Sequence, residues 1–97
     1  MLFHVRIAVS LPADLDYAGR AELLDEEKIY CQKLHEAGTL LHLWTVAGHY
    51  ANISVFDVED ADALHDVLWN LPLFPFLTLE ITPLAAHPST VAIAGAA

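Results

Sequence analysis

Apolar and polar residues follow two different periods along this chain, and each period predicts a type of element. Short segments rich in β-branched residues, beginning with Leu2–Ser10, are typical of strands. Two longer segments repeat their apolar residues at helical spacing. In chain order, the expected strands cover residues 2–10, 40–47, 50–58 and 76–82, and the expected helices cover residues 16–37 and 61–70.

Residues with special backbone roles mark the ends of these elements. Pro12 lacks a backbone donor and should end the first strand. Acidic residues at the start of the first helix suit the helix dipole, and Gly38 is a natural stop after it. Asp57 or Asp60 can cap the second helix. We expect residues 83–97, which hold two prolines and a tail of small residues, to be irregular.

The order β-α-β-β-α-β predicts one α+β domain over residues 1–97. This order is typical of a ferredoxin-like sandwich, a four-stranded antiparallel sheet with both helices on one face. The other face then lacks a helical cover, and we expect Trp44, Tyr50 and Phe56 to lie on it. Exposed aromatic side chains are costly in water, so this face should be buried between subunits.

Composition excludes several classes of function. Of the 97 residues, 56% are hydrophobic, and 4 Lys and Arg stand against 13 Asp and Glu. So few cations cannot neutralise the phosphates of nucleic acid or of an anionic membrane surface. Apolar runs stay shorter than the roughly 18 residues of a membrane span. Cys31 has no partner for an internal disulfide, and the N-terminus lacks the layout of a signal peptide, which together favour the cytoplasm.

Glu27 is the most informative position on the first helix. At about 100° per residue, it falls within an apolar stripe formed by Leu23, Leu34, Cys31 and their neighbours. A carboxylate on a buried stripe needs either a pairing cation or a pocket. A structural pair with Lys28, Arg6 or Arg20 is one interpretation. The other is a desolvated general base, since burial raises the pKa of a carboxyl group.

Other candidates for chemistry are weaker. Lys28 lies at the edge of the stripe and can act as an electrostatic partner, or can be an ordinary solvated lysine. Tyr50 and Asn52 alternate onto one face of a strand and can donate hydrogen bonds to a ligand oxygen, or can simply pack. Histidines such as His4 lack ligand spacing, so we expect no metal site, and the chain has no glycine-rich phosphate loop. Cys31 is interpreted as a packed thiol.

From Met1 to about Thr90 the chain resembles the muconolactone delta-isomerases. The resemblance is carried by segments that occur in the family's order and spacing. They include MLFHVR at the start, EK at Glu27-Lys28, HLW ending at Trp44, GHYAN ending at Asn52, SVFDV, LPLFPF and HPS. It implies a ferredoxin-like homodecamer with active sites shared between subunits and no metal or organic cofactor. It also implies conversion of muconolactone to 3-oxoadipate enol-lactone in catechol degradation, with Glu27 as the base.

The resemblance gives the remaining candidates a role. Lys28 is expected beside Glu27 in catalysis, and His4, Tyr50, Asn52 and Trp44 are expected to bind the lactone. Three positions depart from the family, because Leu41, Thr45 and Ala86 are uncharged where relatives often carry basic residues. Two alternatives therefore stay open: a related dehydrohalogenase or isomerase of a less charged lactone, and a non-catalytic ligand-binding oligomer.

Overall fold

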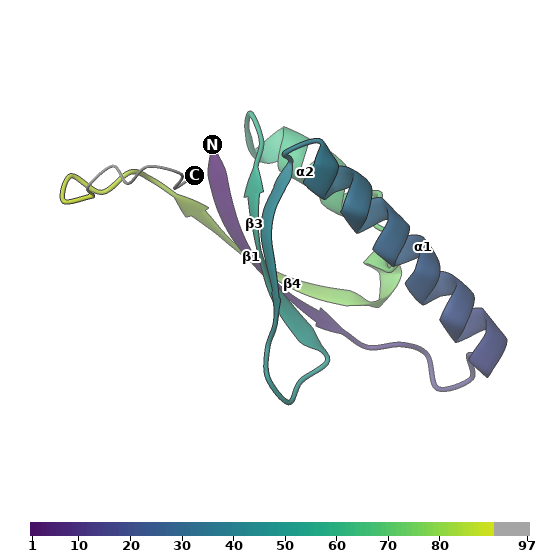
Figure 1. The fold of residues 1–97 in the computed structure, drawn as a ribbon. Coiled ribbons are helices and arrows are strands. Elements are labelled where there is room, and N and C mark those ends of the chain that lie inside the picture. Colours follow the sequence, from purple (N-terminus) through teal and green to yellow (C-terminus); the bar gives the residue numbers. More distant parts are fainter. Residues whose placement is uncertain (91–97) are drawn as a thin grey trace.

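The computed structural model describes residues 1–90 and has the predicted order of elements. The elements are β1 (Leu2–Val9), α1 (Tyr17–Glu36), β2 (Leu40–Thr45), β3 (Ala51–Asp57), α2 (Ala61–Trp69), a short 3-10 helix η1 (Phe74–Phe76) and β4 (Leu77–Leu84). The four strands form one antiparallel sheet in the order β2-β3-β1-β4. Both helices cover the same face of this sheet (Figure 1), so the ferredoxin-like α+β prediction is confirmed.

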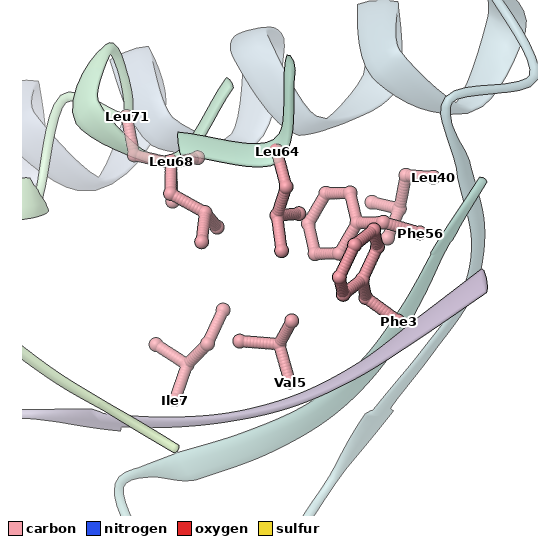
Figure 2. Close-up of a cluster of buried hydrophobic side chains, with 8 residues drawn as sticks. All are labelled: Phe3, Val5, Ile7, Leu40, Phe56, Leu64, Leu68 and Leu71. Carbon is pink, nitrogen blue, oxygen red and sulfur yellow. The ribbon is translucent and has the colours of Figure 1, made fainter. Parts of the chain in front are cut away.

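The core lies between the sheet and α2. Alternate residues of β1, Phe3, Val5 and Ile7, point to the helical side, as the period of two predicts. Figure 2 shows them facing leucines of α2, of which Leu64 and Leu68 are both 2% exposed. The amphipathic pattern of α2 is therefore what closes the core.

Capping residues fix the ends of both helices. The Asp16 carboxylate accepts a hydrogen bond from the Gly19 amide at 2.7 Å, and the Asp60 carboxylate accepts one from Ala63 at 2.8 Å. Asp57, the other predicted cap of α2, instead pairs with the N-terminal ammonium at 3.2 Å. The first turn of α1 holds no acidic residue, so the expected acidic start is limited to the cap itself. Gly38 adopts φ 77°, which suits a residue that ends a helix.

The fourth strand is displaced toward the C-terminus relative to the prediction. Phe76 belongs to η1, and β4 continues through Pro83 and Leu84, two residues expected to be irregular. A proline is tolerated there because β4 is an edge strand, where a missing backbone donor need not break a ladder. Residues 85–90 lack regular structure, as expected, and the rest of the predicted tail, 91–97, lies outside the described residues.

The prediction for the uncovered face is correct for Trp44 and wrong for Phe56 and Tyr50. In the β2–β3 register, Trp44 pairs with Ile53 on the open face, whereas Phe56 is 2% exposed and belongs to the core under the helices. Tyr50 precedes β3 and lies on the helical side with Arg20 of α1. Large exposed apolar side chains are therefore not confined to the open face, as was expected, but also lie on α1, on α2 and on the strands.

Helix α1 buries its side chains less completely than α2 does. None of its 20 residues is fully buried, and the half-buried ones, among them Leu23, Glu27, Cys31 and Leu34, recur on one face. Its N-terminal half projects beyond the sheet in Figure 1. Within residues 1–90, no helix combines the length and apolar character needed to cross a bilayer. The incomplete burial of α1 leaves space between this helix and the sheet.

Candidate active site under the first helix

A cavity of about 310 Å³ lies between α1, the sheet and the segment after α2. Most of its wall is apolar, and its polar side chains come mainly from one face of α1 and from β3. The lining residues that bear polar groups are Glu27, Lys28, Cys31, Gln32, His35, Asn52 and Ser54. An apolar cavity with a few converging polar groups is the usual form of a small-molecule site.

The Glu27 carboxylate is held at two points inside this cavity. Its Oε1 accepts a hydrogen bond from the Leu73 amide at 3.0 Å, and its Oε2 accepts one from the Cys31 thiol at 3.7 Å. Burial raises the pKa of Glu27 above its ordinary value, and the two hydrogen bonds act in the opposite direction without cancelling that effect. A carboxylate in these surroundings is a stronger base than one in water.

Local sequence explains why the Leu73 amide points at Glu27. The chain turns after α2 through Leu71-Pro72-Leu73, and η1 begins directly afterwards with a proline in its first turn. Leu71 and Leu73 are each 4% exposed, so both anchor the turn in the core. The backbone donor is consequently fixed by packing and does not depend on a mobile side chain.

Cys31 contributes a weak donor and no nucleophile. It lies one helical turn after Glu27, and its burial, together with the neighbouring carboxylate, raises the pKa of the thiol to about 12. The thiolate is therefore scarce at neutral pH. This agrees with the interpretation of Cys31 as a packed thiol.

Asn52 brings an unpaired polar atom to the opposite wall. It lies on β3, and its Oδ1 is buried without a hydrogen-bond partner. Neighbouring Ser54 is fully buried but donates its hydroxyl to the Val5 carbonyl at 3.3 Å. A buried amide group without a partner is costly, and a ligand that enters the cavity can supply the missing hydrogen bond.

The six site residues predicted from the sequence fall into three groups. Glu27, Lys28 and Asn52 line the same cavity. Tyr50 lines a smaller neighbouring cavity of about 170 Å³. His4 pairs with Val55 and Trp44 with Ile53 on the open face of the sheet, on the side away from Glu27. A single chain therefore brings three of the six residues into one cavity, places Tyr50 at the neighbouring cavity, and leaves His4 and Trp44 on the opposite face of the sheet.

His35 lines the cavity and was missed by the sequence analysis. Its Nδ1 donates a hydrogen bond to the Leu40 carbonyl at 2.6 Å, which leaves Nε2 as an acceptor in the neutral ring. The signal that could have found it is the spacing of Glu27, Cys31 and His35, which are four residues apart along one face of α1.

The interpretation of Glu27 as half of a structural ion pair does not hold. Among residues 1–90 the ion pair present joins the N-terminus to Asp57, and neither Lys28, Arg6 nor Arg20 lies within pairing distance of Glu27. The described residues also contain no group of three or more His, Cys, Asp and Glu side chains placed to hold a metal ion. The polar groups that line the cavity are thus a carboxyl group with a raised pKa, several hydrogen-bonding groups and one lysine.

Fold and site together define a ferredoxin-like domain with a carboxyl group of raised pKa in a largely apolar cavity. Comparison with known proteins narrows this class. The family model described as muconolactone delta-isomerase matches residues 1–90. The chain belongs to this family.

Individual relatives agree along almost the whole length. A muconolactone delta-isomerase from Rhodococcus opacus is 52% identical over 90 residues, which are 93% of this chain and 97% of the relative. One from Pseudomonas putida is 50% identical over 91 residues, covering 94% and 95%. The crystal structure of a muconolactone isomerase superposes with a TM-score of 0.90 at 50% identity, covering 96% of this chain and 97% of that one.

Proposed function

We propose that this chain is a cofactor-independent isomerase that shifts the double bond of muconolactone, or of a substituted muconolactone, to give the 3-oxoadipate enol-lactone. The observation that carries the proposal is Glu27, a half-buried carboxylate with a raised pKa in an apolar cavity. Membership of the muconolactone delta-isomerase family supports the choice of substrate.

The reaction needs one base that also acts as an acid. Glu27 removes the proton from the ring carbon that bears the acetate arm, and the C–H electron pair forms a dienolate conjugated with the lactone carbonyl. The protonated Glu27 then returns the proton to the carbon beside that carbonyl, which moves the double bond. Because the same proton leaves and returns, no oxidant or reductant is required. A pKa raised toward neutrality suits both steps.

The dienolate places negative charge on the lactone carbonyl oxygen, which needs donors or a nearby cation. Lys28 and the amide of Asn52 line the same cavity as Glu27 and are our candidates for this role. Tyr50 lines the neighbouring cavity and can reach the substrate from there. His4 and Trp44 lie on the open face, so any contact they make with a lactone requires a second copy of the chain.

A less charged lactone is the second candidate substrate. The wall of the cavity is largely apolar, and the family positions Leu41, Thr45 and Ala86 bear no charge in this chain. Loss of chloride from a chlorinated lactone would use the same proton abstraction by Glu27. In that reaction the electron pair expels chloride, and no proton returns.

Turnover of a matched set of lactones tests the proposal. The wild-type chain is incubated with muconolactone, its methyl ester and a chlorinated muconolactone, and the products are followed by ultraviolet absorbance and by release of chloride. We expect enol-lactone from muconolactone. If muconolactone binds but stays unchanged while chloride is released from the chlorinated lactone, the dehydrohalogenase is correct. Binding of all three without turnover would make the chain a ligand-binding module.

We also propose a cytoplasmic homo-oligomer, a decamer as the family resemblance implies. The exposure of Trp44 at 55% and Leu43 at 40% supports burial of the β2 edge between copies. The free Cys31 is in keeping with a reducing compartment. Native mass spectrometry tests the assembly, and a species of about ten chains is expected.

A further inference from the structure

A second cavity adjoins the one that holds Glu27. It has a volume of about 170 Å³ and is lined by Val9, Leu11, Arg20, Leu24, Tyr50 and Leu73. Three of these residues, Val9, Leu24 and Leu73, also line the Glu27 cavity, so the two spaces share a wall. Leu73 is the residue whose amide holds Glu27. A ligand that reaches Glu27 therefore has the second cavity directly beside it.

Arg20 brings a positive charge to this second cavity, and positive charges are scarce in this chain. The chain has only 4 Lys and Arg against 13 Asp and Glu, and Arg20 is the cation at this site. Arg20 also lies near the start of α1, where the helix dipole disfavours a positive side chain. No carboxylate of residues 1–90 pairs with it, since nearby Asp16 caps the helix through the Gly19 amide. Helix stability does not account for an arginine here.

The position of Arg20 relative to Glu27 suits a small bifunctional ligand. Arg20, Leu24 and Glu27 are spaced four and three residues apart, so they share one face of α1. Seven residues correspond to about 10 Å along a helix axis, a distance that two long side chains and a small lactone can span. Tyr50 lines the same cavity from the turn before β3 and carries a phenolic hydrogen-bond donor.

We infer that Arg20 and Tyr50 form the site that binds the carboxylate arm of the substrate, with the lactone ring in the Glu27 cavity. The inference rests on the proposed function, which supplies a substrate with a ring and a carboxylate. The planar guanidinium of Arg20 presents paired N–H donors that match the two oxygens of a carboxylate. The Tyr50 hydroxyl donates a further hydrogen bond. Arg20 is thus the residue that selects acidic lactones over neutral ones.

Steady-state kinetics with two substrates test this assignment. Wild type, Arg20→Gln and Arg20→Lys are compared on muconolactone and on its methyl ester. Lys33→Gln is the matched control, because it removes the same charge from α1 outside both cavities. For Arg20→Gln we expect KM for muconolactone to rise tenfold or more with kcat changed less than threefold, and kcat/KM for the ester to change less than twofold. Arg20→Lys should recover part of the affinity.

Each other outcome has a definite meaning. If Arg20→Gln matches Lys33→Gln on muconolactone while wild type converts it, the carboxylate site is wrong and the proposed function stands. If the ester suffers the same loss as the acid, Arg20 has only a structural role, and the inference is overturned. If Lys28→Gln, and not Arg20→Gln, raises KM for the acid alone, the carboxylate binds at Lys28. If wild type converts neither lactone, the proposed function itself fails, and the inference fails with it.

Discussion

Replacement of Glu27 by glutamine separates the charge of this residue from its shape. The glutamine carbonyl oxygen can still accept the hydrogen bond from the Leu73 amide that Oε1 accepts at 3.0 Å. The new amide NH₂ then faces Cys31, whose sulfur is a weak acceptor. The side chain therefore keeps its position in the cavity and loses its ability to take a proton.

The expected loss of rate follows from the role that we propose for Glu27. A positioned general base contributes roughly 10²- to 10⁴-fold to a rate, which is about 2.7 to 5.4 kcal/mol in the activation free energy. Within residues 1–90 no other carboxylate lines the cavity, so no described neighbouring group can replace this one. We expect kcat for muconolactone to fall by at least about a hundredfold, within that range.

The assay follows enol-lactone formation by ultraviolet absorbance, with far-ultraviolet circular dichroism as a check on folding. Glu26→Gln is the control, because Glu26 is the exposed carboxylate next in sequence and lines neither cavity. It should leave kcat within about twofold, as expected for a surface carboxylate that takes no part in proton transfer. Equal kcat values for Glu27→Gln and wild type would refute the assignment of the base.

Glu27→Gln should lower the rate of turnover but raise the stability of the fold at neutral pH. Burial raises the pKa of Glu27 above its ordinary 4.5, so the folded chain binds this proton more tightly than the unfolded chain does. The contribution of Glu27 to stability is therefore complete below about pH 4.5 and is lost as pH rises through the folded-state pKa. Glu27→Gln should unfold at higher urea concentration than wild type at pH 7, and this difference should shrink at pH 4.

Three further predictions concern the support of the site and the core. Cys31→Ser places a stronger donor on Glu27 Oε2, so the acidic limb of the kcat profile should move to lower pH, whereas Cys31→Ala should move it to higher pH. Asp60→Ala should lower the free energy of unfolding in urea by about 1 kcal/mol through loss of the α2 cap, and Asp60→Asn by clearly less. Leu68→Ala should cost about 2–5 kcal/mol by the same measurement, and a loss below about 1 kcal/mol would contradict its place in the core.

Helical periodicity was sufficient to find Glu27 because a helix repeats at a fixed angle. A charged residue within an apolar stripe is visible from spacing alone, and the structure places that residue at a cavity. The same method did not predict the Leu73 amide, since a backbone donor leaves no mark on residue type. Nor could it predict that Arg20 and Tyr50 line the same small cavity, because that depends on how the turn before β3 approaches α1.

The faces of the sheet were harder to assign than the order of the strands. Phe56, Ser54 and Asn52 alternate onto one side of β3, but alternation alone does not say which side the helices cover. In β2 the register shifts between Leu40 and His42, so Leu41 is an extra residue that breaks the alternation. A bulge of this kind cannot be read from an almost wholly apolar segment such as Leu40–Thr45.

The different burial of the two helices explains how so short a chain accommodates a half-buried carboxylate. Leu64 and Leu68 of α2 seal the core against β1, and α1 contributes no fully buried residue to it. A polar group on α1 therefore costs little packing, whereas one on α2 would disrupt the core. Because α1 remains partly lifted from the sheet, its inner face can present Glu27 to a ligand in place of core side chains.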